Sequence, residues 1–135
     1  MAKILVIDDE QSMRRLIGRI LASAGHEVIE AADGNHGLKQ FIAHRPNVVV
    51  TDIFMPDKEG IETIKELRRI APTVRIVAIS GGGAAQDTVF LDYAKALGAD
   101  FALVKPFRAD ALTAAVEAGV PHADHPCNMV RGNPP

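Results

Sequence analysis

The chain alternates short apolar runs with amphipathic segments, and this alternation limits the folds that it can adopt. The apolar runs are typical of strands because they are short, bounded by polar or turn-forming residues, and rich in Val, Ile, Leu and Ala. The run NVVVTD is apolar without interruption, which is typical of a strand buried on both faces. The predicted strands are Lys3–Ile7, His26–Ala31, Asn47–Asp52, Arg75–Ile79 and Asp100–Val104.

Each predicted strand is followed by a predicted helix. The clearest is Gln11–Ala24, which carries Leu16, Ile17 and Ile20 on one face and is followed by Gly25, a typical helix terminator. The other predicted helices run from the Asp33-Gly34 turn to His44, over Ile61–Ala71 before Pro72, over Asp87–Leu97 before Gly98, and over Ala109–Ala118.

A strand–helix unit that recurs five times predicts an α/β fold, in which a parallel sheet is covered by helices on both faces. Right-handed crossovers then place the carboxyl ends of all strands at one edge of the sheet. From Gly119 onward the sequence VPHADHPCNMVRGNPP has no apolar period. We therefore expect one domain over residues 1–118 and a flexible tail over residues 119–135.

Charge and composition exclude several classes of function. The formal net charge of -2 argues against a sequence-independent grip on nucleic acid, which needs a basic surface. The single cysteine, Cys127, allows no intrachain disulfide and indicates a reducing compartment. The apolar run Ile4–Ile7 is too short for a signal peptide or a membrane span. We expect a cytoplasmic protein that does not bind a membrane.

Polar residues stand where the predicted strands end. Asp8 and Asp9 follow the first strand, Asp52 ends the third, and Ser80 and Lys105 follow the fourth and fifth. Carboxylates that lie close together repel one another unless a cation lies among them, and Mg²⁺ is the usual cation for oxygen ligands. The sequence therefore predicts a magnesium site at this edge.

These groups together suit phosphoryl transfer. A metal ion, the ammonium of Lys105 and the hydroxyl of Ser80 would form a clamp for the oxygens of a phosphoryl group. Asp52, at the end of a central strand, would be the nucleophile and would form an acyl phosphate. Each residue alone also has a structural interpretation: Asp8-Asp9 or Glu10 as a helix cap, Ser80 as a turn residue, and Lys105 as a solvated strand end.

The motifs VIDDE, DIFMP, AIS and LVKPF occur in that order and resemble those of the receiver domain of bacterial two-component response regulators. The resemblance covers about residues 3–118. It implies a flavodoxin-like, doubly wound five-stranded parallel sheet with the strand order 2-1-3-4-5. It also implies that the Lys105-Pro106 peptide bond is cis.

The resemblance assigns roles to the residues at the predicted edge. Asp52 becomes the phosphoacceptor, and Asp9, Asp52 and the backbone carbonyl of Phe54 become Mg²⁺ ligands. Asp8 assists the metal through water. Ser80 and Lys105 contact the phosphoryl group.

The implied function is a stand-alone response regulator. It would accept a phosphoryl group from a histidine kinase or histidine phosphotransfer protein, and signal by phosphorylation-dependent protein binding or by phosphorelay. It would not be an enzyme beyond its own phosphorylation and dephosphorylation, and we expect no DNA-binding output. Arg14, Arg15 and Arg19, off the apolar stripe of the first helix, form either a solvated face or a docking surface for the kinase.

The sequence departs from the receiver pattern at the expected switch residue. Receivers usually carry Tyr or Phe three residues before the lysine, where this chain has Ala102. Strand alternation directs the neighbouring Phe101 to the opposite face, unless a bulge restores it to the switch position. We therefore expect the signal to travel through backbone movement of the loop after Ser80. The stretch GGGAAQD lengthens that loop, either as a plain surface insertion or as a mobile lid.

Two other functions use related chemistry. A Mg²⁺-dependent aspartyl-phosphate phosphatase of haloacid-dehalogenase type would need an Asp-x-Asp motif on the first strand, which Asp8-Asp9-Glu10 does not provide. Flavin binding in the flavodoxin manner would need a hydroxyl-rich loop after that strand, whereas the loop here is acidic. Turnover of small phosphate esters and an absorbance spectrum distinguish these alternatives from a receiver.

Overall fold

A parallel five-stranded sheet forms the centre of the computed structural model, which describes residues 1–53, 60–80, 92, 95, 96 and 98–118. The strands are β1 (Lys3–Ile7), β2 (Glu27–Ala31), β3 (Val48–Asp52), β4 (Arg75–Ser80) and β5 (Phe101–Val104). Their order is β2-β1-β3-β4-β5, and every neighbouring pair is parallel. This confirms the predicted fold and strand order.

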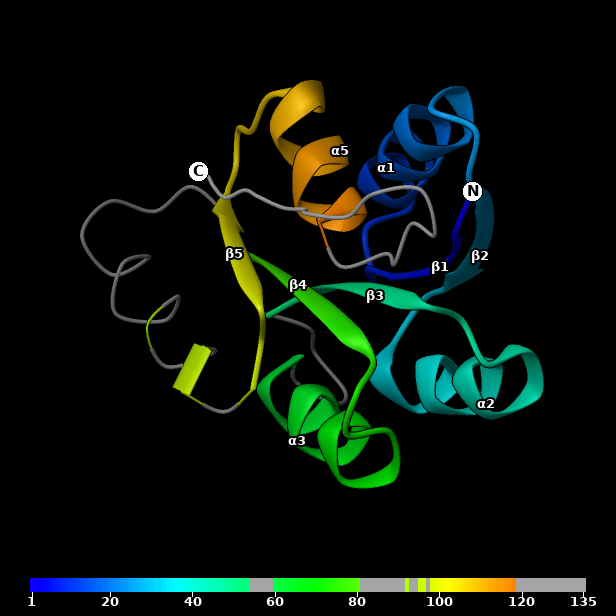
Figure 1. Ribbon diagram of the computed structural model, residues 1–135, viewed down its shortest axis with the longest axis vertical. Coiled ribbons are helices and arrows are strands. Elements are labelled where there is room, and N and C mark those ends of the chain that lie inside the picture. Colours follow the sequence, from blue (N-terminus) through cyan, green and yellow to red (C-terminus); the bar gives the residue numbers. More distant parts are fainter. Residues whose placement is uncertain (54–59, 81–91, 93–94, 97, 119–135) are drawn as a thin grey trace, which may run out of the picture.

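Helices cover both faces of the sheet, with α1 and α5 on one side and α2 and α3 on the other (Figure 1). The helices are α1 (Gln11–Ser23), α2 (Gly34–His44), α3 (Gly60–Ile70) and α5 (Ala109–Glu117). Most of the helix predicted over Asp87–Leu97, the stretch GGGAAQD and the predicted tail lie outside the described residues. None of the described helices is long and apolar enough to cross a membrane.

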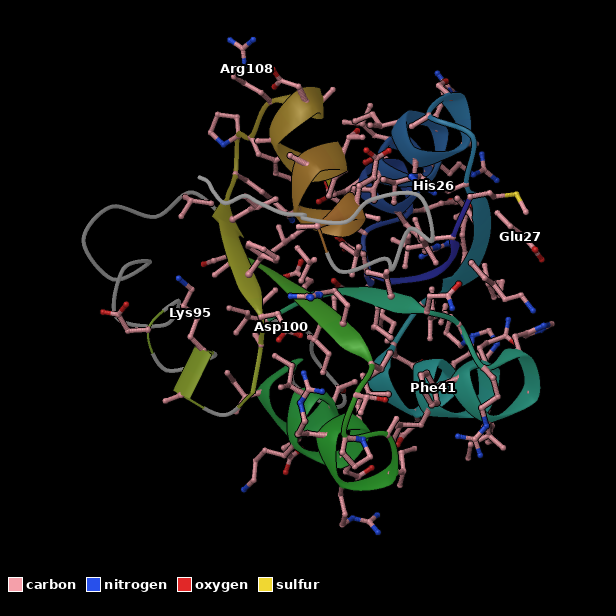
Figure 2. The ribbon with its side chains drawn as sticks, viewed as in Figure 1. His26, Glu27, Phe41, Lys95, Asp100 and Arg108 are labelled. Carbon is pink, nitrogen blue, oxygen red and sulfur yellow. The ribbon has the colours of Figure 1, made fainter. Side chains whose placement is uncertain are left out.

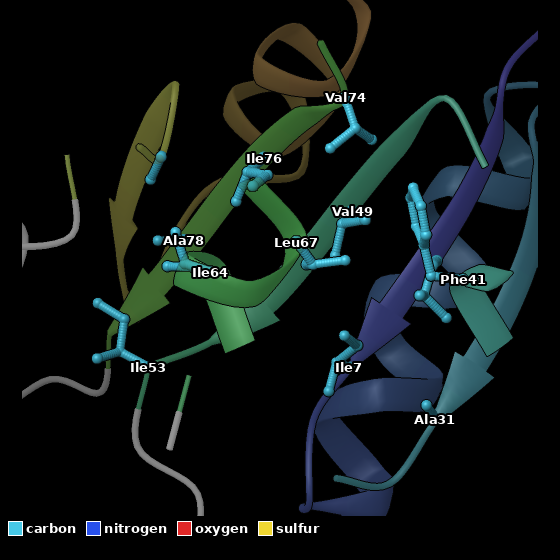
Figure 3. Packing of buried hydrophobic residues seen from close by; sticks show 12 residues of the cluster. Ile7, Ala31, Phe41, Val49, Ile53, Ile64, Leu67, Val74, Ile76 and Ala78 are labelled. Atoms are coloured by element: carbon cyan, nitrogen blue, oxygen red, sulfur yellow. The ribbon is translucent and has the colours of Figure 1, made fainter. Parts of the chain in front are cut away.

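Two hydrophobic clusters, one on each face, hold the layers together. Successive residues of β1 point into different clusters: Leu5 and Ile7 face α2 and α3, whereas Ile4 and Val6 face α1 and α5. Figure 3 shows residues of the first cluster, among them Phe41 from α2 and Ile7 from β1. A central strand buried on both faces needs apolar residues at every position, which explains the uninterrupted runs in β1 and β3.

The predicted boundaries of the five strands and of the helices α1, α2, α3 and α5 hold to within a residue or two. Gly25 has a φ of +94°, a conformation that favours glycine, and follows α1. The predicted Asp33-Gly34 turn is the start of α2, where the Asp33 carboxylate accepts a hydrogen bond of 2.7 Å from the backbone N–H of His36.

Two residues predicted to begin strands instead make side-chain contacts just before the strands. His26 and Asp100 are both labelled in Figure 2. His26 Nδ1 accepts a hydrogen bond of 3.0 Å from the Ala2 N–H, and its Nε2 lies 3.0 Å from Glu117 Oε2. Asp100 Oδ2 accepts a hydrogen bond of 2.9 Å from the Ile76 N–H and lies 3.1 Å from Arg68 Nη2. Strands β2, β3 and β5 begin one residue later than predicted, at Glu27, Val48 and Phe101.

Candidate functional site

Three aspartates meet at the carboxyl edge of the sheet. Asp8 and Asp9 follow β1, and Asp52 ends β3, which is the neighbour of β1 in the sheet. One carboxylate oxygen from each of the three residues lies within 4.8 Å of the others. Adjacent parallel strands thus bring together residues that are far apart in the sequence.

Asp8 is the most deeply buried member of this acidic cluster, with only 1% of the residue exposed. Burial raises the pKa of its carboxyl to about 6, and the negative charge of Asp52 adds to this rise. The hydrogen bond from the Glu10 N–H lowers the pKa, but by less. Within the described part of the chain, its Oδ2 atom is buried and accepts no hydrogen bond. A buried carboxylate oxygen in this state is costly unless a cation approaches it.

Lys105 brings a positive charge to the same place from the end of β5. Its Nζ lies 3.2 Å from Asp52 Oδ2 and 3.8 Å from Asp8 Oδ2. Burial lowers the pKa of the lysine, but the charges of Asp52 and Asp8 outweigh that effect, so that its pKa is raised and the ammonium is retained. The Lys105-Pro106 peptide bond is cis, as predicted.

Ser80 ends β4 beside these residues and is fully buried. Asp52 pairs with Ile79 across the β3–β4 ladder, so Ser80 stands one position beyond the partner of Asp52. The Ser80 carbonyl accepts a hydrogen bond of 2.8 Å from the Lys105 N–H. The two predicted phosphoryl-contacting residues are therefore joined through their backbones.

The acidic cluster fits a small divalent cation. It offers carboxylate oxygens from three residues, which are the ligand type that Mg²⁺ prefers. Asp8 also has a buried oxygen, Oδ2, that accepts no hydrogen bond from the described residues and lies 3.8 Å from the Lys105 ammonium. Asp9 is exposed, so the cluster is reachable from solvent. The fourth predicted metal-binding residue, Phe54, lies outside the described residues.

The helix-cap alternative for the acidic pair does not hold. The residue before α1 is Glu10, and its side chain makes no capping hydrogen bond. Asp8 instead accepts the Glu10 N–H through Oδ1, at 2.9 Å, in a tight turn after β1. The acidic pair is thus held at the end of the strand.

Two residues near the cluster carry contacts that the sequence does not reveal. A Cβ at Gly60, the first residue of α3, would overlap the carbonyl oxygen of Asp52 and lie 2.6 Å from Ile53 Cα. The sequence predicts a solvated or docking face for Arg14, but its guanidinium is mostly buried and hydrogen-bonded to the carbonyl of Asp8. Neither contact could be predicted from the sequence, because Gly60 is a single glycine without a motif and Arg14 has the same local pattern as Arg15.

The predicted placement of Phe101 is confirmed. Phe101 and Leu103 pack against the cluster formed with α1 and α5, whereas Ala102 pairs with Ala78, which belongs to the opposite cluster. The β4–β5 pairing runs without interruption from Phe101 to Val104, so no bulge restores Phe101 to the switch position.

The fold and the site define a doubly wound α/β protein with an acidic pocket and a lysine at the carboxyl edge of its sheet. The chain belongs to the family of response regulator receiver domains, whose family model matches residues 4–117. It is 37% identical over 115 residues to the chemotaxis protein CheY of Bacillus subtilis, covering 84% of this chain and 93% of that protein.

Longer regulators and solved structures are also similar. The chain is 37% identical over 124 residues to the probable transcriptional regulator ycf27 of Cyanophora paradoxa, covering 92% of this chain and 50% of that protein. A response regulator receiver domain protein from Clostridium thermocellum has a TM-score of 0.82 at 33% identity, covering 88% of this chain and 94% of that one.

Membership of this family implies a general function. Receiver domains of the CheY type are signalling phosphoacceptors that bind Mg²⁺ in an acidic pocket and interact with histidine kinases or phosphotransfer proteins. The cluster of Asp8, Asp9 and Asp52 is compatible with such a pocket. The phosphatase alternative receives no support from these similarities.

Proposed function

We propose that this chain accepts a phosphoryl group on Asp52 from the phosphohistidine of a histidine kinase or histidine phosphotransfer protein. It then signals by phosphorylation-dependent protein binding or by passing the phosphoryl group onward. The observation that carries the proposal is the meeting of three carboxylates with the Lys105 ammonium at one edge of the sheet.

Asp52 is the nucleophile in this proposal. A carboxylate oxygen of Asp52 forms a bond to phosphorus, while the bond between phosphorus and the imidazole nitrogen of the donor breaks. The electron pair of that bond leaves with the nitrogen, and the product on this chain is an acyl phosphate. Asp52 is 7% exposed, which limits access of water to the acyl phosphate.

Asp9, Asp52 and the backbone carbonyl of Phe54 would hold Mg²⁺, with Asp8 assisting through water. When bound, the metal supplies positive charge that offsets the carboxylates and the oxygens of the transferring phosphoryl group. The raised pKa of Asp8 supports this assignment, because it reflects a burial cost that a cation would relieve.

Lys105 and Ser80 would contact the phosphoryl oxygens. The ammonium of Lys105 lies 3.2 Å from Asp52 Oδ2 and can follow the charge from the carboxylate to the new phosphate. Ser80 would donate its hydroxyl hydrogen. The hydrogen bond between the Lys105 N–H and the Ser80 carbonyl supports a coupled movement of these residues on phosphorylation.

The proposed signal passes through the backbone after Ser80, since Ala102 cannot replace an aromatic switch residue. Phe101 supports this view because it is packed on the other face of β5, where Arg75 Cζ lies 5.4 Å from its ring centroid. A ring held there cannot swing toward the pocket without losing its core contacts.

The test is incubation with acetyl phosphate and Mg²⁺, followed by intact-mass measurement. We expect a single phosphate adduct on the wild type and on the control Asp110→Asn, which removes an exposed carboxyl that is paired with Arg108 at the start of α5. Asp52→Asn should show none. An adduct that persists on Asp52→Asn would refute the assignment, and sustained turnover of small phosphate esters would favour a phosphatase instead.

A further inference from the structure

Arg14 reaches back from the first turn of α1 to the end of β1. Its Nη1 donates a hydrogen bond of 2.7 Å to the backbone carbonyl oxygen of Asp8. Its Nε donates a hydrogen bond of 3.0 Å to Glu30 Oε1 on β2. Only 14% of the Arg14 side chain is exposed, so it does not form part of a free basic surface.

The other polar atoms of Asp8 show what this contact accomplishes. The Asp8 N–H donates a hydrogen bond of 3.1 Å to the Ala31 carbonyl, and Asp8 Oδ1 accepts one of 2.9 Å from the Glu10 N–H. With the Arg14 bond to the carbonyl, three of the four polar atoms of Asp8 are held by the chain. The fourth, Oδ2, is buried, accepts no hydrogen bond from the described residues and lies 3.8 Å from the Lys105 ammonium.

Arg14 is itself held in place. Glu30 supplies a carboxylate on the neighbouring strand, and the planar guanidinium can satisfy both Glu30 and the Asp8 carbonyl in fixed directions. The position one helical turn further along α1 is Gly18, where a Cβ would lie 3.4 Å from Glu30 Oε2. A methyl group there would be in ordinary van der Waals contact with the Glu30 carboxylate, so Glu30 lies directly against this part of α1.

We propose that Arg14 is a positioning residue for the metal site, which fixes the turn Asp8–Glu10 so that its carboxylates face Asp52. This inference rests on the proposed function, because it concerns the same acidic pocket. Arg14 would not touch the metal or the phosphoryl group. It acts through the backbone of Asp8, as residues behind a ligand commonly do.

Electrostatics alone predicts the opposite result, which makes the proposal easy to test. Removal of a positive charge close to an acidic pocket reduces repulsion of Mg²⁺, so a purely electrostatic effect would tighten metal binding. Loss of positioning weakens it. The direction of the change in Mg²⁺ affinity therefore separates the two effects.

The experiment measures Mg²⁺ affinity by isothermal titration calorimetry on the whole chain. We expect Arg14→Met to weaken Mg²⁺ binding roughly tenfold. The control is Arg15→Met, which removes the same charge from the adjacent, exposed position of α1 and should leave the affinity within about twofold of the wild type. Arg14→Lys should give an intermediate affinity, because an ammonium cannot hold both partners in fixed directions.

Thermal unfolding with and without Mg²⁺ provides a second readout. A merely structural role would lower the melting temperature equally in both conditions. Positioning also reduces the increase in melting temperature that Mg²⁺ produces. If Arg14→Met does not fold, Arg14→Lys decides: weaker Mg²⁺ binding supports the proposal, and wild-type binding overturns it.

The outcomes separate this inference from the proposed function. Wild-type or tighter Mg²⁺ binding by a folded Arg14→Met overturns the positioning role and leaves Asp52 phosphorylation intact as a proposal. A wild type that binds no Mg²⁺ overturns both. Weakening in Arg14→Met but not in Arg15→Met supports both.

Discussion

Gly60 packs against the carbonyl group of Asp52. A Cβ at Gly60 would overlap the Asp52 carbonyl oxygen and lie 2.8 Å from the Asp52 carbonyl carbon. The Gly60 N–H also donates a hydrogen bond of 2.8 Å to the Ile53 carbonyl. The start of α3 thus lies directly on the backbone of the proposed phosphoacceptor.

Gly60→Ala is therefore expected to shift Asp52 and impair its phosphorylation. The overlap is with backbone atoms, which cannot rotate away, so we expect a loss of about 1–3 kcal/mol in the free energy of unfolding. The rate of adduct formation with acetyl phosphate, followed by intact mass, should also fall.

Gly25→Ala provides a matched control. Gly25 has a φ of +94°, and a Cβ added there would meet no heavy atom within 4 Å, so alanine at this position is strained without a clash. It should lower stability by about 1 kcal/mol and leave phosphorylation unchanged. If both variants form the phosphate adduct at the wild-type rate, the packing of Gly60 does not position Asp52.

Asp8 should make Mg²⁺ binding depend on pH near its raised pKa of about 6. Protonation removes the charge that attracts the metal, so affinity should fall as the pH drops below about 6 and level off above it. Calorimetry across this range, in buffers with different ionisation enthalpies, should also detect proton release on binding. Asp8→Asn should abolish that release.

The same carboxyl should affect the stability of the metal-free protein. Its pKa is about 6 in the folded state and about 4 in the unfolded state, so the folded state binds the proton more tightly. Between these values the contribution of Asp8 to stability falls as the pH rises, and the penalty is complete above about 6. The free energy of unfolding of the wild type minus that of Asp8→Asn, measured with urea at several pH values, should fall as the pH rises from about 4 to about 6. A difference that rises with pH would contradict this prediction.

Arg68 should contribute strongly to stability at the edge of the sheet opposite the acidic cluster. Its guanidinium donates hydrogen bonds to the carbonyl oxygens of Pro72, Val74 and Gly98 and to Asp100 Oδ2, with lengths of 2.6–3.1 Å. Removal of a charged group that serves four acceptors, two of them part-buried, costs all four of these hydrogen bonds.

Arg68→Met should therefore lower the free energy of unfolding by about 3 kcal/mol. The exposed neighbour Arg69 is the control, and Arg69→Met should change stability by less than about 0.5 kcal/mol. Because the contacts of Arg68 join the amino ends of β4 and β5, Asp52 phosphorylation should be unaffected in folded Arg68→Met. Equal losses in the two variants would show that the network adds nothing.

Phe101 should act in packing and not in signalling. Phe101→Ala should cost about 2 kcal/mol of stability, less than for a fully buried phenylalanine because the residue is half-buried. Leu103→Ala, on the same face of β5, is the matched control. Both variants should form the Asp52 adduct at the wild-type rate.

The signalling role can be tested with a partner. If Ala102→Tyr leaves the partner affinity of both phosphorylation states unchanged, and Phe101→Ala abolishes the difference between them, then Phe101 is the switch and the proposed backbone route is wrong.

Much of the fold could be predicted because its signals are local. The uninterrupted apolar run of β3 reflects burial on both faces, and the alternation of strand and helix leads to a parallel sheet with one functional edge. Asp8, Asp52 and Lys105 could be selected because they stand where strands end. The strand order was inferred from the resemblance to receivers, because the alternation of strands and helices does not determine which strands are neighbours in the sheet.

The contacts of Arg14, Gly60 and Arg68 could not be predicted, because each depends on a partner distant in space or carries no distinctive pattern. Arg14 and Arg15 look alike in the sequence, yet only Arg14 is turned toward Asp8. The sequence pattern places Asp100 in a strand, whereas in the structure it lies just before β5 and accepts a hydrogen bond from Arg68 of α3. That contact depends on how α3 packs, which the pattern does not encode.

The sequence by itself determined the elements, the apolar faces and the kinds of side chain at the carboxyl edge, because these follow from periodicity and chain direction. Only the tertiary structure decided which atoms meet: a buried carboxylate oxygen of Asp8 lies 3.8 Å from the Lys105 ammonium, while Arg14 donates a hydrogen bond to the Asp8 carbonyl. Such contacts depend on distances of a few ångströms between elements, which packing sets and a linear pattern does not encode.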